Sequence, residues 1–213
     1  MADTQNRSRP PLARASVAAL LVGLVLLTAG GLLIPADKTL GSATRWVFVH
    51  GAVTWTGILS SLGAGAMALW LLLSREQVPG GFRIGSALWR LVSIALLLWA
   101  ASLGLGFPVM KMSWGGVLWN EPRLLMSMEI VFLLLVAWVV GLVVENRRVL
   151  AFAALAAAVA MVVLLLMTSG AFHPDNPIFG SGSPRFIISF VSLLAGMLAL
   201  VTGAVLLRRR AVA

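Results

Sequence analysis

Apolar residues fall into six long runs, separated by short polar stretches that are rich in glycine, proline and arginine. A helix needs about 20 consecutive apolar residues to cross the hydrocarbon core of a bilayer, and each run is that long. The pattern predicts membrane-spanning helices over residues 15–34, 46–73, 84–107, 123–144, 149–169 and 184–207. Pro35 and Pro108 are expected to end the first and third helices, and Pro122 to open the fourth. The expected fold is therefore an all-α, polytopic membrane protein with six transmembrane helices.

Basic residues are distributed unevenly between the two sides of these predicted spans. One side holds both termini and the connections after the second and fourth spans, with eleven of the 16 lysines and arginines: Arg7, Arg9, Arg14, Arg75, Arg83, Arg90, Arg147, Arg148, Arg208, Arg209 and Arg210. The other side holds five: Lys38, Arg45, Lys111, Arg123 and Arg185. The positive-inside rule places the side with more basic residues, and so both termini, in the cytoplasm. We expect a cytoplasmic tail over residues 1–14, a transmembrane domain over 15–207 and a basic cytoplasmic tail over 208–213.

Composition supports a membrane class and excludes several functions. The chain is 60% hydrophobic and 11% charged, with a mean hydropathy of +1.00. Its net charge of +9 comes largely from arginines at helix ends, so it indicates orientation in an inner or plasma membrane rather than nucleic-acid binding. There is no cysteine, which excludes thiol chemistry by the chain itself. The first apolar run is too long for a signal-peptide core, so we expect it to be retained as a helix.

The chain has only two histidines, His50 and His173, and the topology puts both near the outer surface. Neutral imidazole is a common axial ligand of haem iron. Two imidazoles at similar depth would bind one iron from opposite faces if the second and fifth helices are neighbours. The alternative is that each histidine bonds a backbone group at a helix end. We predict that His50 and His173 are axial ligands of a haem.

A tryptophan-rich segment lies between the two histidines, from Trp114-Gly115-Gly116 through Trp119 to Glu121-Pro122-Arg123. Tryptophan supplies flat apolar surface for a porphyrin, and glycine lets a backbone approach a flat ligand closely. Lys111, Arg123 and Arg185 are outer cations that would pair with haem propionates, or with lipid headgroups. Met110 and Met112 are alternative iron ligands.

These residues resemble the haem-handling membrane proteins of cytochrome c maturation, the CcmC/CcsA group with its tryptophan-rich "WWD" loop. Trp114 and Gly115 match the opening of that loop, Trp119 one of its later tryptophans, Glu121 its acid and Arg123 its basic end. Val117, Leu118 and Asn120 depart from the loop's aromatic positions, so the motif is degenerate. His50 and His173 resemble the family's two outer histidines, and the six-helix arrangement with both termini inside agrees with the small branch of the family.

The resemblance implies a protein that holds haem b at its outer face for attachment to c-type cytochromes. It would act as a carrier and assembly factor, with no chemical step of its own. Implied partners are haem, a haem chaperone, a haem exporter complex and apocytochrome c, besides the lipid bilayer.

Two other functions stay open from the residues alone. One is a membrane redox subunit with a single outer haem. The other is a small-molecule transporter or a structural subunit without haem, and Glu129 keeps this alternative open because ionisable residues inside spans are costly. Simpler explanations for that glutamate are that it pairs with Arg123 or that its side chain reaches back to the outer membrane interface.

Overall fold

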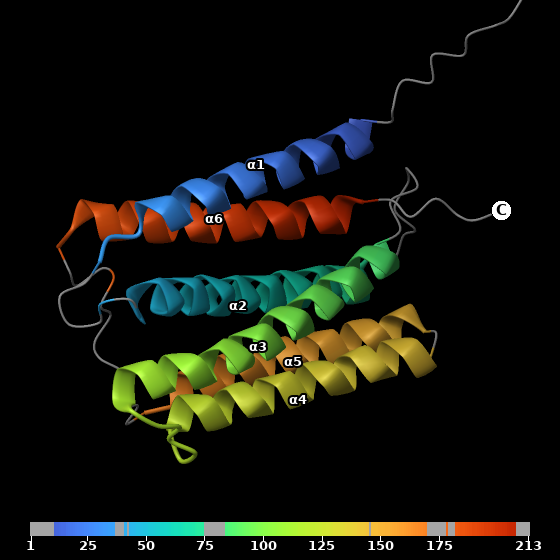
Figure 1. Ribbon diagram of the computed structural model, residues 1–213. Helices are drawn as coiled ribbons and strands as arrows, with labels where there is room; N and C mark the ends of the chain where they lie inside the picture. Colours follow the sequence, from blue (N-terminus) through green and yellow to red (C-terminus); the bar gives the residue numbers. More distant parts are fainter. Residues whose placement is uncertain are drawn as a thin grey trace, which may run out of the picture.

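Six helices make up the computed structural model (Figure 1), which describes residues 11–36, 41, 43–74, 84–144, 146–169, 178 and 182–207. Their bounds are α1 Pro11–Leu33, α2 Ala43–Leu73, α3 Ile84–Trp114, α4 Pro122–Val143, α5 Arg147–Met167 and α6 Pro184–Leu206. All six are long and apolar enough to cross a membrane. The prediction of an all-α fold with six potential spans is confirmed.

The third helix is longer than predicted, because it continues through Pro108 to Trp114. Proline removes one hydrogen bond, to the carbonyl of Gly104 four residues earlier, and its ring crowds that carbonyl. An apolar segment has few other partners for its backbone groups, so continuing the helix satisfies most of them. The prediction that Pro108 ends this helix is wrong, and Trp114 is its last residue.

Polar residues extend or shift the other helix ends by a few positions. Asn146 caps α5, and its side chain accepts hydrogen bonds from the backbone N–H groups of Arg148 and Val149 at 2.9 and 3.4 Å. The two arginines therefore belong to the first turn of α5, which begins before the predicted 149. The first helix, α1, begins at Pro11 rather than 15, so four residues of the predicted tail are helical.

The helices form two groups. Four of them, α2 to α5, enclose a core whose buried members include Val92, Trp99, Ile130 and Met161. In Figure 1, α3 crosses obliquely over α2, and α4 and α5 lie side by side. The other two, α1 and α6, form an antiparallel pair that joins the rest through contacts of α6 with α2 and α3.

The starts of α2, α4 and α6 and the ends of α1, α3 and α5 lie at one end of the bundle (Figure 1). We call this end, which holds Trp114 and Trp119, the tryptophan end. The start of α1 and the end of α6 lie at the opposite end, as an even number of spans requires. The described residues that were predicted to lie outside belong to these helix ends or lie near them, so they gather at the tryptophan end.

Candidate functional site at the tryptophan end

His50 lies about two turns into α2 and is half-buried against α3. Its Cε1 atom is 3.7 Å from the position that a Cβ atom on Gly106 would occupy. The terminal methyl group of Met110, which is buried, lies 4.0 Å from the same position. An imidazole and a thioether therefore converge on one glycine of α3, and both are chemically suited to bind haem iron.

The backbone that carries His50 is tied to α3 by two hydroxyl groups. Thr54 Oγ1 donates to the carbonyl oxygen of His50 at 2.8 Å and lies 2.5 Å from Ser102 Oγ. Because a hydroxyl has a single proton, Ser102 is the donor in the second contact. This chain of hydrogen bonds sets the position of α2 relative to α3 one turn from the imidazole.

Trp114 and Gly115 form the end of α3 rather than an open loop. The Gly115 N–H donates to the carbonyl of Lys111 at 3.1 Å, and its φ of 76° lies in the left-handed region. Such a residue stops a helix, and glycine adopts it without steric cost. The glycine was expected to let the backbone approach a flat ligand, whereas the structure gives it the role of a helix terminator.

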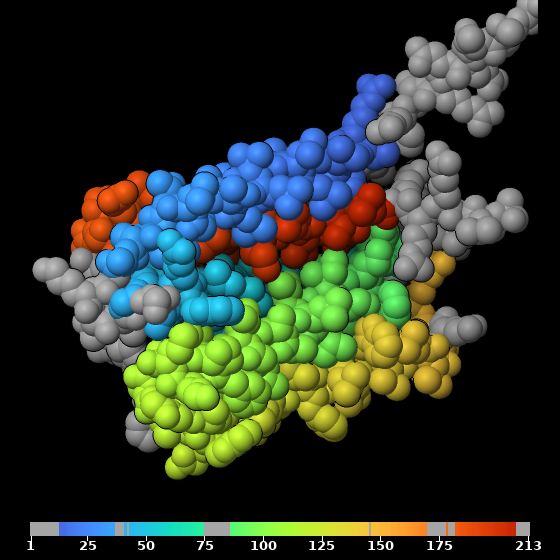
Figure 2. Space-filling view, in the orientation of Figure 1, coloured from blue at the N-terminus to red at the C-terminus, as the bar shows by residue number. Residues whose placement is uncertain are grey.

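Trp119 folds back onto α3. Its ring centroid lies 5.7 Å from that of Phe107, with an interplanar angle of 49°. The side chain is nevertheless 65% exposed, so much of the indole is open to the surroundings. In Figure 2 the end of α3 and the segment that follows it form one continuous surface, in lime, at this end of the molecule. An open aromatic surface is what a stacked porphyrin would require.

Glu121 is only 1% exposed and caps α4. Its Oε2 atom accepts a hydrogen bond from the Leu124 N–H at 2.7 Å, and Pro122 follows at the first position of the helix. A carboxylate at a helix N-terminus is stabilised by the free N–H groups there. The sequence predicts that Glu121 is part of a cofactor site. Among the described residues it caps α4, and its N–H closes the turn that contains Trp119 by donating to the Leu118 carbonyl.

Exposed cations surround this end of the bundle. Arg123 is the second residue of α4, and it is exposed, as are Lys111 on α3 and Arg185 on α6. These three are the predicted partners of haem propionates. Their exposure at one end of the bundle leaves them able to bind carboxylates or phosphates.

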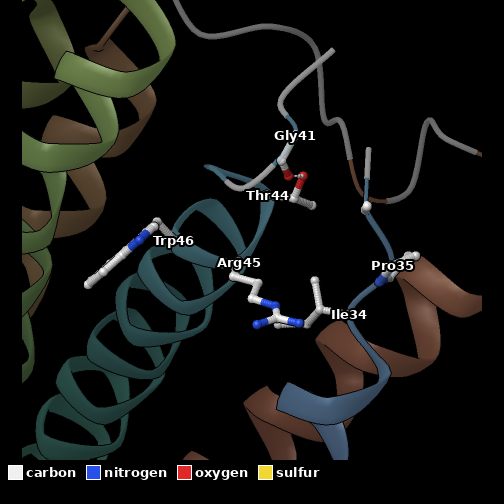
Figure 3. A pocket seen from close by; sticks show the side chains of 7 residues that line it. Ile34, Pro35, Gly41, Thr44, Arg45 and Trp46 are labelled. Atoms are coloured by element: carbon white, nitrogen blue, oxygen red, sulfur yellow. Dashed lines mark hydrogen bonds between the residues drawn. The ribbon is translucent and has the colours of Figure 1, made fainter. Parts of the chain in front are cut away.

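A cavity that the sequence did not predict lies at the same end, between the residues that follow α1 and the start of α2. It has a volume of about 450 Å³ and is lined by Ile34, Pro35, Ala36, Gly41, Thr44, Arg45 and Trp46. Figure 3 shows the guanidinium of Arg45 reaching toward Ile34, whereas Trp46 points to the other side of α2. In the sequence, Arg45 counts only as one of the basic residues on the predicted outer side. The sequence does not predict that it lies beside the end of α1. The cavity is not lined by His50 or by Trp119.

His173 lies outside the described residues, so its predicted pairing with His50 stays a prediction. Glu129 is exposed on α4, which argues against a role in a polar path through the bundle. Within the described ranges, no three histidine, aspartate or glutamate side chains come together as a metal site.

Comparison with known proteins adds no family assignment. No family model matches the chain, and no curated protein is significantly similar to it.

Proposed function

We propose that the chain spans a cell membrane, with its termini in the cytoplasm, and binds one haem b at the tryptophan end on the outer face. The observation that carries the proposal is the half-buried imidazole of His50 on Gly106, at the same end as the open indole of Trp119 and the cations Arg123 and Lys111. An axial nitrogen ligand, a flat apolar surface and counter-charges for carboxylates are the three things that a haem needs from a protein.

The residues have distinct roles in this proposal. His50 and His173 would hold the iron, and Met110, whose methyl group also lies against Gly106, is an alternative ligand. Trp119 would lie along the ring, while Arg123, Lys111 and Arg185 would hold its propionates. A bound haem would supply a redox-active iron centre, and the exposure of Trp119 would leave it accessible to an acceptor protein. We propose that the protein holds haem for transfer to an acceptor such as apocytochrome c, as its resemblance to the cytochrome c maturation proteins implies.

The visible spectrum of the protein purified in mild detergent tests haem binding directly. We expect a Soret band and sharp reduced α and β bands, which His50→Ala and His173→Ala both abolish or shift. Trp119→Ala should weaken haem binding, whereas Trp55→Ala, which removes a tryptophan that is 50% exposed on another face, should not. A double histidine variant that keeps its full haem content would refute the proposal.

Gly106 offers a second test, because the glycine makes room for the imidazole. Gly106→Leu should displace His50 and lower the affinity for haemin by about tenfold, which corresponds to about 1.4 kcal/mol. Gly104→Leu is the matched control, since no atom lies within 4 Å of a Cβ added there. Equal haemin affinity in the two variants would show that the contact on Gly106 does not position a ligand.

Sidedness can be measured cleanly because the chain has no cysteine. A single cysteine at Trp119 should react with a membrane-impermeant maleimide added to intact cells, and a single cysteine at Arg147 should react only after the membrane is opened. The reverse result would put the tryptophan end in the cytoplasm and exclude an outer haem site.

A further inference from the structure

Glu129 is a carboxylate on the outward surface of a potential membrane span. It is the eighth residue of α4, which begins with Pro122, so it lies about 10 Å from the start of the helix. Its side chain is exposed, whereas Met126 and Ile130 beside it are buried. In a bilayer whose surface lies at the start of α4, a glutamate side chain at that depth would be too short to reach water, and an unpaired carboxylate in hydrocarbon is costly.

The described residues do not provide a partner for this carboxylate. No hydrogen bond or ion pair of Glu129 is found among them. Arg123, the expected partner, is six residues earlier on the same helix, which places it about 120° away around the axis and about 9 Å along it. Helical partners are spaced three or four residues apart, so this pair does not meet.

The surface around Glu129 is an apolar stripe along the whole length of α4. Its exposed large residues recur at intervals of three and four: Leu125, Met128, Phe132, Leu135, Val136, Val139, Leu142 and Val143. This spacing is the one by which two helices pack side by side along a shallow angle. A stripe of this kind with a single acid in it differs from a surface made only for lipid.

We propose that the Glu129 stripe of α4 is the docking surface for a transmembrane helix of a partner protein that carries a lysine or arginine at the same depth. The charge selects the partner, because a basic side chain would neutralise and bond the carboxylate away from water. The inference requires that the bundle spans a membrane, but it does not require that the protein binds haem.

A second copy of the chain fits less well as the occupant. Among the described basic residues, Arg14, Arg45, Lys111, Arg123, Arg147, Arg148 and Arg185 all lie within about one turn of a helix end. Arg90 lies deeper, but its guanidinium donates to the carbonyls of Ser86 and Leu207 near the opposite end of the bundle. No described basic side chain of a parallel copy would therefore match the depth of Glu129.

The test uses the full-length protein in phosphatidylcholine vesicles with synthetic helices of leucine and alanine, about 22 residues long. One peptide has a lysine two turns from each end, so that its orientation does not matter. A second peptide has leucine at those positions, and a third has one lysine at its centre. Energy transfer between labelled protein and labelled peptide reports binding. We expect the first peptide to bind about tenfold more tightly than the other two, and Glu129→Leu to remove the difference.

A matched variant separates the stripe from simple charge pairing. Val191 is the eighth residue of α6, which also begins with a proline at the tryptophan end, and it is 48% exposed. Val191→Glu in the Glu129→Leu background puts a carboxylate at the same depth on another surface and should not restore tight binding. Full restoration, or equal binding of all three peptides to the wild type, would overturn the proposal. Self-association that depends on Glu129 and exceeds peptide binding would overturn it in favour of a second copy.

Discussion

The α1–α6 pair and the α2–α5 group are both made of apolar helices, but they are held together in different ways. In the pair, glycines seven residues apart on each helix, Gly23 and Gly30 on α1 and Gly196 and Gly203 on α6, bring the two backbones together. In the α2–α5 group, large side chains fill the centre, and Trp99 is completely buried with its indole N–H 3.3 Å from Ser61 Oγ.

This difference indicates which group of helices can hold a ligand site. A contact between backbones leaves no room for a ligand, whereas a core of large side chains has side-chain surface to offer at its ends. His50, Trp114, Gly115, Trp119, Glu121 and Arg123, the described residues of the predicted site, all belong to the α2–α5 group or to its connections. We therefore infer that the α1–α6 pair stabilises the protein, whereas the α2–α5 group carries the ligand site.

The largest effect is expected from emptying the centre of the α2–α5 group. Trp99→Ala should lower the free energy of unfolding by about 3–5 kcal/mol, because it leaves a cavity and removes the partner of Ser61. Unfolding by dodecyl sulfate in mixed micelles, followed by circular dichroism, measures it. Trp55→Ala is the control, since that side chain is half exposed and its loss should change the free energy little. Equal losses in the two variants would contradict a core centred on Trp99.

A smaller but sharper effect is expected in the α1–α6 pair. Gly30→Leu places a Cβ atom 2.9 Å from the backbone nitrogen of Leu193, so the two helices must separate, at a cost of about 1–3 kcal/mol. Gly31→Leu is the neighbouring control, because no atom lies within 4 Å of a Cβ added there. The same unfolding experiment compares them. Haemin affinity should be unchanged in Gly30→Leu, and a loss as large as that of His50→Ala would mean that the pair is part of the site.

The cap of α4 should contribute less. Glu121→Ala removes the acceptor of the Leu124 N–H and should lower the free energy of unfolding by about 0.5–2 kcal/mol, while Glu121→Gln should retain most of it. Glu129→Ala, on the exposed surface of the same helix, serves as the control. If Glu121→Ala leaves the unfolding midpoint unchanged but abolishes haem binding, the residue belongs to the ligand site rather than to the cap.

The smallest effect concerns the hydroxyl pair that ties α2 to α3. A double-mutant cycle of Thr54→Val and Ser102→Ala should give a coupling of about 0.6 kcal/mol, the average for such bonds between membrane helices. Thr28→Val is a control, because the hydroxyl of that exposed threonine bonds only within α1, to the carbonyl of Leu24. A coupling of zero would mean that the contact does not align the two helices.

For the candidate site, the described residues that the sequence predicted lie at one end of the bundle, but several of them have roles there that the sequence did not predict. Trp119 and Arg123 are exposed at the predicted end, and Trp119 has open aromatic surface. Glu121 and Gly115 match a motif, but the structure uses them to begin and end helices. A sequence motif contains only residue types. Glutamate and glycine are suited both to helix ends and to ligand contacts, so the motif does not distinguish the two roles.

The sequence alone predicted that six apolar helices form and roughly where each begins, because the length of an apolar run and its flanking polar residues are local properties. It did not predict the end of α3, because that helix continues through Pro108 to Trp114. Tertiary structure decided what depends on contacts between distant residues. It determined that α1 pairs with α6, that His50 packs on Gly106, and that Arg45 lies beside the end of α1. It also determined that Glu129 points outward, because a helix that is apolar on all sides does not reveal which of its faces will find a neighbour.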